Sequence, residues 1–283
     1  MLKGVLNINK DSGLTSAAVV AKVRRILQTK AVGHMGTLDP QGTGVLIIGV
    51  GKATRLFDFY LKKDKQYIAD FEFGYTTDTL DGDGIITDKT AAVPTKGAVI
   101  KALKKFVGNL DQLPPNYSAK SINGVRAYDL ARQGKTPDLK TAKVRIGKFE
   151  FIEQKSPAKY TFKIDCSSGT YIRSLCRDLA DAVGSLACMT SIHRTKSGAF
   201  SDTKAITVKE LETLKDTALI SIEEALGELQ RIDFDKSFYD KISNGVKIEC
   251  KKQDNPFAVY CNNELFGIGQ SDGRLKITTF LKD

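Results

Sequence analysis

Two segments of the chain alternate apolar and polar side chains, and this pattern limits the folds that its 283 residues can adopt. Residues 65–74 (KQYIADFEFG) put Tyr67 and Phe73 on one side and Asp70 on the other, and residues 159–167 (KYTFKIDCS) alternate in the same way. A period of two is typical of strands that bury one face. Such strands belong to mixed or antiparallel sheets, because fully buried parallel strands have continuous apolar runs.

Three further segments have the spacing of helices, namely residues 14–28, 98–110 and 171–184. Thr15 or Ser16 is the expected N-cap of the first helix, and a glycine is expected to end the second. Helices and strands do not alternate strictly. The sequence therefore predicts an α+β fold, in which helices pack on a mixed or antiparallel sheet.

The pattern changes near residue 231. Short strand-like runs follow at 244–250, 257–263 and 265–277, separated by Gly, Asn and Asp. We therefore expect a main domain over residues 1–230 and a small β module over residues 231–283.

The charge of the chain is concentrated in the predicted main domain. The net charge is +10, and residues 231–283 contribute nine basic and eight acidic residues, so +9 lies in residues 1–230. Such a surplus fits a polyanion, most plausibly nucleic acid, although solubility alone is the simpler alternative. Residues 116–145 hold seven basic and two acidic residues, with Tyr117 and Tyr128 between them. This favours a segment that grips RNA over a solvated connector.

Several kinds of chemistry find no support in the sequence. Five cysteines without a CxxC pair and only two histidines argue against a disulfide framework, a zinc site or a hydrolase triad. Residues 49–54 (GVGKAT) lack the glycine and hydroxyl of a P-loop, and residues 78–84 (DTLDGDG) lack the spacing of a calcium loop. We expect no metal, free thiols and, without a signal peptide or a spanning segment, a cytoplasmic protein that does not enter membranes.

The most unusual segment is residues 33–46 (GHMGTLDPQGTGVL), where four glycines surround Asp39 and Pro40 follows it. Glycine allows positive φ and close backbone approach, and proline biases the preceding residue towards an extended conformation. The loop is therefore expected to present one carboxylate on a stiff backbone. An ordinary turn is the alternative, because Asp before Pro is common in turns.

Together, these segments resemble the TruB family, the bacterial tRNA pseudouridine-55 synthases. The resemblance covers nearly the whole chain and follows the order of the family's motifs. It departs from the family at several positions, which are Asp11 in place of proline, Met35 and residues 41–43 (QGT) in the Asp39 loop, Lys120 and Ser121, and Ile192 and His193 in place of leucine and arginine. The similar segments are residues 4–16, 33–46, 65–84, 114–134 and 167–180.

The resemblance implies a pseudouridine synthase fold that ends in a short PUA-like RNA-binding module. It implies isomerisation of uridine 55 in the T-loop of tRNA to pseudouridine, with base flipping and without a cofactor or a metal. Asp39 would be the nucleophile, attacking C6 or C1′ or assisting an elimination. The other implied roles are an ion partner of Asp39 (Arg173), a stacking ring (Tyr67), a filler of the vacated space (His34), pocket walls (Tyr171, Ile192) and loop support or phosphate contact (Lys10).

The resemblance also implies which partners the protein binds. The T-arm of tRNA would be bound by a monomer that needs no obligate protein partner. Two alternatives remain open at this point. One is an RNA-binding or tRNA-folding protein in which catalysis is secondary or lost, and the other is a synthase that works with guide RNA and partner proteins.

Overall fold

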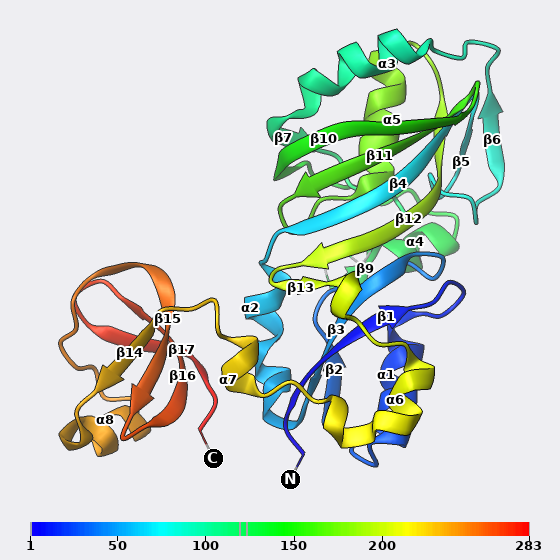
Figure 1. The fold of residues 1–283 in the computed structure, drawn as a ribbon. Coiled ribbons are helices and arrows are strands. Elements are labelled where there is room, and N and C mark those ends of the chain that lie inside the picture. The colour runs from blue at the N-terminus through cyan, green and yellow to red at the C-terminus, as the bar shows by residue number, and fades with distance from the viewer. Residues whose placement is uncertain (1, 119, 123, 283) are drawn as a thin grey trace.

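The computed structural model describes residues 2–118, 120–122 and 124–282, and its centre is a large mixed sheet (Figure 1). Within these residues the sheet has nine strands, and β12 and β3 are its one parallel pair. This confirms the predicted α+β class. In spatial order the path is β1 (Gly4–Lys10), β3 (Thr43–Val50), β12 (Ala187–Ser197), β4 (Lys65–Phe73), β11 (Lys159–Cys166), β10 (Ala142–Ser156) and β7 (Gly108–Gln112), with β2 (Val32–His34) beside β3 and β13 (Phe200–Ser201) beside β12.

Helices cover the sheet in two groups (Figure 1). In the first group, α1 (Ser16–Ile26) contacts α6 (Val208–Leu214). In the second, α5 (Ile172–Ala182) packs on β12 and β4, and α3 (Lys96–Leu103) packs on α5 and β10. Thr15 is the N-cap of α1, as predicted, since its side chain accepts a hydrogen bond from the Ala18 N–H at 3.0 Å.

The second predicted helix is present and ends before Gly108, as expected: α3 continues into a 3-10 turn, η2 (Lys104–Phe106), and Gly108 then begins β7, which pairs with β10. One local prediction was wrong. Asp70 does not face solvent but is 6% exposed. Its carboxylate accepts hydrogen bonds from Thr161 Oγ1 at 2.7 Å and from Lys155 Nζ at 3.0 Å, which compensate for its burial.

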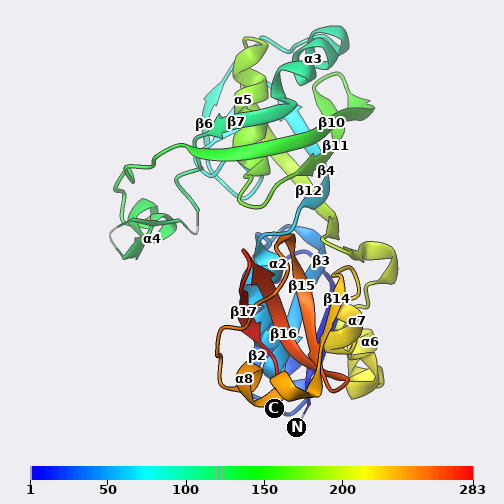
Figure 2. The same ribbon diagram turned by 90° about the vertical axis from the view of Figure 1, so that its left-hand side faces the viewer.

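Most of the basic segment 116–145 leaves the sheet between β7 and β10 as an arm (Figure 2), but its last four residues, 142–145, lie in β10 and pair with β7. It contains a two-strand ladder and a short helix, α4 (Ala127–Arg132). The remaining short elements of residues 2–230 are η1 (Gly51–Leu56), α2 (Phe57–Leu61), β5 (Tyr75–Thr77), β6 (Ile86–Lys89), β8 (Ser121–Ile122), β9 (Val125–Arg126), η3 (Asp202–Lys204), η4 (Lys215–Ala218) and α7 (Ile222–Ala225).

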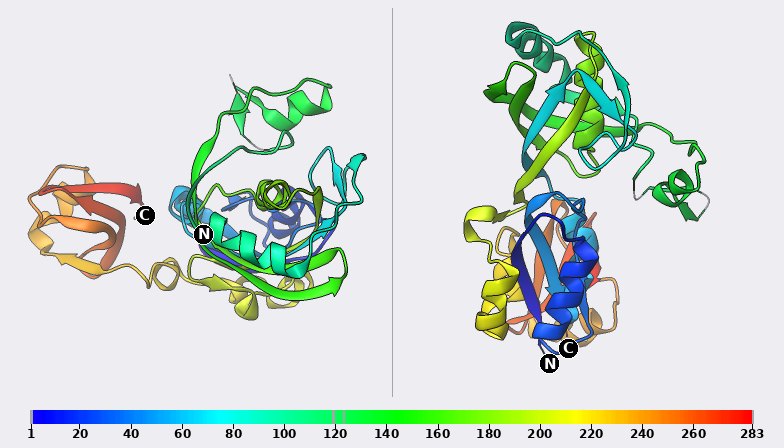
Figure 3. Two further views of the ribbon diagram at one scale, coloured as in Figure 1. Left: turned by 90° about the horizontal axis from the view of Figure 1, so that it is seen from above. Right: turned by 90° about the vertical axis from the view of Figure 1, so that its right-hand side faces the viewer.

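The C-terminal residues form the predicted small β module, with a core of its own that includes Phe257 and Phe266. It extends from the body in a different direction from the arm (Figure 3). The run at 244–250 forms no named strand and contributes only an isolated bridge from Glu249 to Arg274. The module consists of β14 (Arg231–Phe234), η5 (Lys236–Phe238), α8 (Tyr239–Ser243), β15 (Gln253–Cys261), β16 (Glu264–Ser271) and β17 (Leu275–Phe280).

Two further findings concern the whole described chain. All five cysteines are free thiols, as predicted, and four of them are buried. In the described residues, the helices are too short or too polar to cross a membrane.

Candidate active site

The loop that carries Asp39 joins β2 to β3, and the residues on both sides of Asp39 are fixed. Ser16 Oγ bonds both backbone groups of Leu38, accepting from its N–H at 3.0 Å and donating to its carbonyl at 3.1 Å. On the other side, the Pro40 carbonyl accepts from Lys10 Nζ at 2.9 Å and from the Gly13 N–H at 2.9 Å. The stiff presentation of one carboxylate, expected from the sequence, thus has a physical cause.

Lys10 binds this loop from the interior of the protein and not from its solvent-exposed side. Its side chain is completely buried, and Nζ also donates to the carbonyls of Leu14 at 2.7 Å and Asp11 at 2.9 Å. Three acceptors match the three N–H groups of an ammonium. Of the two roles considered for Lys10, this geometry supports the loop rather than a phosphate contact.

Arg194, which the sequence reasoning did not single out, fixes the loop from the sheet. Its Nε donates to the Val45 carbonyl at 2.7 Å, and its Nη2 and Nη1 donate to those of Gly36 at 3.1 Å and Thr37 at 3.2 Å. Gly44 lets β3 lie close to the backbone of Arg194 on β12: its φ is +94°, and a Cβ there would stand 2.3 Å from the Arg194 carbonyl oxygen. That contact explains one of the glycines noted in the sequence.

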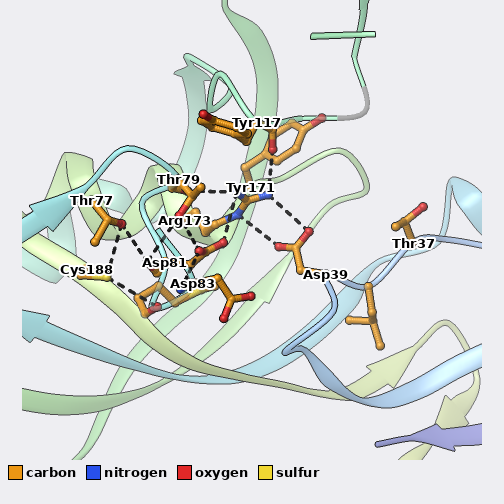
Figure 4. Close-up of polar contacts among 12 residues, drawn as sticks. Thr37, Asp39, Thr77, Thr79, Asp81, Asp83, Tyr117, Tyr171, Arg173 and Cys188 are labelled. Atoms are coloured by element: carbon orange, nitrogen blue, oxygen red, sulfur yellow. Dashed lines mark hydrogen bonds and ion pairs between the residues drawn. The ribbon is translucent and has the colours of Figure 1, made fainter. Parts of the chain in front are cut away.

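Arg173, at the start of α5, forms a two-point ion pair with Asp39 (Figure 4). Its Nε lies 3.1 Å from Asp39 Oδ2, and its Nη2 lies 3.3 Å from Oδ1. The Arg173 side chain is 8% exposed and that of Asp39 is 39% exposed, so the carboxylate keeps an open side. Burial raises the pKa of Asp39, and the Arg173 guanidinium acts against that rise.

The turn between β5 and β6 supplies further partners for the Arg173 guanidinium. Its Nη1 lies 3.3 Å from Asp81 Oδ2 and donates to the Thr79 carbonyl at 3.0 Å, while Nη2 donates to the Tyr117 carbonyl at 3.0 Å. Thr79 Oγ1 fixes Asp81 by donating to its Oδ1 at 2.6 Å. The sequence argued against a calcium loop here and the turn belongs to a segment that resembles the family, but Asp81 was assigned no role. The signal was the cluster of acids, which also raises the pKa of Asp39.

The two tyrosines expected at the site lie near Asp39. Tyr67 is on the central strand β4, 8% exposed, and pairs in register with Arg194 of β12. Tyr171 immediately precedes α5, and Figure 4 shows it beside Arg173. Burial raises the pKa of both hydroxyls, and the charge of Asp39 adds to each rise.

Ile192 and His34 lie at the sides of the loop. Ile192 is partly buried, and its Cγ2 would be 3.4 Å from a Cβ at Gly42. His34 helps to line a pocket of about 510 Å³ together with Arg24, Phe57 and Arg126 of the arm. Its Nδ1 is buried and has no hydrogen-bond partner among the described residues.

The sequence also matches two family models. The TruB family pseudouridylate synthase N-terminal domain matches residues 24–172, and the tRNA pseudouridylate synthase B C-terminal domain matches residues 173–231. The chain belongs to the TruB family.

Curated relatives agree along almost the full length. The chain is 39% identical over 281 residues to a tRNA pseudouridine synthase B from Clostridium perfringens (strain 13 / Type A), with 96% of each chain covered. It is 37% identical over 265 residues to one from Borrelia garinii subsp. bavariensis, with 93% of each covered. The protein is therefore a tRNA pseudouridine synthase of the TruB family, an RNA-modifying isomerase, as the resemblance implied.

Solved structures confirm the pseudouridine synthase fold. An H/ACA RNP bound to a substrate RNA containing 2′-deoxyuridine has a chain that matches with a TM-score of 0.75 and 22% identity, covering 99% of this chain and 85% of that one. A Cbf5-Nop10-Gar1 complex has one that matches at 0.74 and 24%, covering 99% and 84%. At these identities the likeness concerns the fold alone.

Proposed function

We propose that this TruB-family enzyme converts uridine 55 in the T-loop of tRNA to pseudouridine, with Asp39 as its nucleophile. The observation that carries the proposal is the Asp39 carboxylate. It stands on a loop fixed on both sides, is held by a two-point pair to Arg173, and is still 39% exposed.

The reaction is an isomerisation and needs no external oxidant or reductant. The bond between C1′ and N1 of uridine breaks, the base turns, and a bond between C1′ and C5 forms. C5 then loses its proton and N1 gains one, so atoms and electrons balance. Asp39 would attack C6 or C1′, or assist an elimination at the sugar, and each route requires the ionised carboxylate.

Arg173 supports this requirement, since its charge favours the ionised form of Asp39 against the effect of burial. The target base must leave its stack to reach Asp39, which costs a few kcal/mol. Tyr67 would stack on the extruded base, and Tyr171 and Ile192 would line the pocket around it. His34 would fill the space that the base leaves.

The rest of the chain would hold the T-arm. We assign catalysis to residues 1–230, RNA gripping to the arm at 116–145, and a smaller share of binding to residues 231–283, whose net charge is only +1. The enzyme would act in the cytoplasm as a monomer without a guide RNA or an obligate protein partner. The intact pair of Asp39 and Arg173 favours catalysis over a role limited to tRNA folding.

The position is tested by chemical mapping. Transcribed tRNA is incubated with the enzyme, treated with a carbodiimide that marks pseudouridine, and read by primer extension. We expect one new stop, directly 3′ of position 55, and none in a control transcript with cytidine at position 55. A stop elsewhere, or no stop, would contradict the proposal.

A further inference from the structure

Among the described residues that are almost completely buried, Arg194 has the largest side chain, and 2% of its surface is exposed. Taking a guanidinium out of water costs several kcal/mol unless its charge is well compensated. Among the described residues no carboxylate forms an ion pair with Arg194, and its hydrogen-bond acceptors are backbone carbonyls. An apolar side chain at this position would cost less free energy to bury, which points to a functional reason for the cation.

The three carbonyls that Arg194 binds lie on both sides of Asp39. Gly36 and Thr37 precede the acid, and Val45 follows it on β3. Because a guanidinium is planar and its donors have fixed directions, it sets the two ends of the loop relative to each other. Lys10 and Ser16 fix only the middle of the loop, at Pro40 and Leu38.

The charge of the same guanidinium also affects two residues that are expected to contact the substrate, Tyr67 and His34. Arg194 is the register partner of Tyr67, and its charge acts against the rise that burial causes in the pKa of the Tyr67 hydroxyl. Its charge also contributes, after burial, to lowering the pKa of His34. One buried cation thus acts on the loop of Asp39, on the stacking ring and on the histidine.

We propose that Arg194 is a positioning residue of the isomerisation. Its guanidinium fixes Gly36 and Thr37 relative to Val45 and thereby sets where the Asp39 carboxylate stands relative to a base stacked on Tyr67. Arg194 does not itself touch the RNA. This inference rests on the proposed role of Asp39.

Lys65 provides a matched control. It is 7% exposed, and its Nζ donates to three carbonyls, those of Tyr60, Leu61 and Lys63, but these lie at the end of α2 and not in the loop. Arg194→Met and Lys65→Met therefore each remove one buried cation and three bonds to carbonyls. Both are expected to lower the melting temperature, and only Arg194→Met is expected to slow the reaction.

The measurement is the single-turnover rate at saturating tRNA, together with the Kd for tRNA. For Arg194→Met we expect a rate about 100-fold below wild type, the size of effect known for small misplacements of reacting groups, with an unchanged Kd. For Lys65→Met both quantities should stay at the wild-type level. Equal rates in the two variants, or parallel losses of rate and Kd in Arg194→Met, would overturn the inference.

A spectroscopic readout separates positioning from general loosening. The chain has only two histidines, so imidazole NMR can follow His34 and His193 separately. The pKa of His34 should rise in Arg194→Met, because a nearby positive charge is gone, and should not move in Lys65→Met. An unmoved His34 in Arg194→Met would contradict the inference.

If Arg194→Met does not fold, Arg194→Lys serves in its place. The lysine keeps the charge but lacks the planar fork, so we expect a slowed rate with an unmoved His34, and a wild-type rate would overturn the inference. Asp39→Asn is run in the same assay. Turnover by that variant would refute the proposed nucleophile, whereas an inactive Asp39→Asn beside a fast Arg194 variant would refute only the positioning role.

Discussion

The two carboxylate oxygens of Asp39 meet two different nitrogens of Arg173, with Nε 3.1 Å from Oδ2 and Nη2 3.3 Å from Oδ1. A fork of this kind fixes the orientation of a carboxylate as well as its charge. The remaining donors of Arg173 are held by Asp81 and by the carbonyls of Thr79 and Tyr117. The position of Asp39 therefore depends on α5, which carries Arg173, on the turn with Thr79 and Asp81, and on the segment with Tyr117.

Arg173→Lys should slow turnover by about 100-fold, because an ammonium cannot reproduce the fork and misplaces the carboxylate. The single-turnover rate at saturating tRNA measures this. Arg177→Lys is the control: it lies one helical turn further along α5 and pairs with Asp178, away from Asp39. A small effect of Arg173→Lys, comparable with that of Arg177→Lys, would show that the fork is unimportant.

The acid limb of the pH–rate profile should move in opposite directions in two variants. The rate falls as Asp39 becomes protonated, and the pKa of Asp39 is raised by burial and by Asp81 and Asp83 but lowered by Arg173. Arg173→Met should therefore move the limb to higher pH, and Asp83→Asn should move it to lower pH. Limbs that stay in place, or move in the same direction, would show that a group other than Asp39 limits the rate.

Gly44→Ala should destabilise the protein more than a comparable glycine replacement. A Cβ at Gly44, where φ is +94°, would stand 2.3 Å from a backbone oxygen, whereas at Gly184, where φ is +69°, it would meet nothing within 4 Å. Gly184→Ala should cost about 1–2 kcal/mol for its left-handed backbone alone. Urea unfolding should give a larger loss for Gly44→Ala, and equal losses would argue against the close approach to Arg194.

Lys135 and Lys140 are exposed on the arm, and replacing both by Ala should weaken tRNA binding. The plot of log K against log salt should also flatten, by about 0.7–0.9 for each phosphate that the variant no longer neutralises. Lys204 and Lys209, exposed near α6, form the control pair. A slope that is unchanged in the arm variant would mean that these lysines face solvent in the complex.

Local patterns in the sequence were enough to predict the class of the fold and the presentation of Asp39, but not the contacts made through space. The alternation in β4 and β11 and the N-cap Thr15 follow from nearest neighbours. Neither Arg194 nor Asp81 was assigned a role, because their partners lie far away in the chain: Arg194 binds Gly36, 158 residues away, and Asp81 forms an ion pair with Arg173.

Local patterns also failed where a distant segment decided the outcome. Asp70 is buried because Thr161 and Lys155 provide donors. Neither partner can be located from the residues around Asp70. The roles of Tyr67, Tyr171, His34 and Ile192 stay predictions, since their placement near Asp39 does not by itself show what they bind.

The most direct test of Asp39 as the nucleophile follows the hydrogen that leaves C5. Unmodified tRNA carrying tritium at uridine C5 is incubated with wild type and with Asp39→Asn, without added cofactor or metal. Wild type should release about one tritium per tRNA, and Asp39→Asn should bind tRNA with the wild-type Kd but release none, since only a carboxylate can act. Appreciable release by Asp39→Asn would contradict the account.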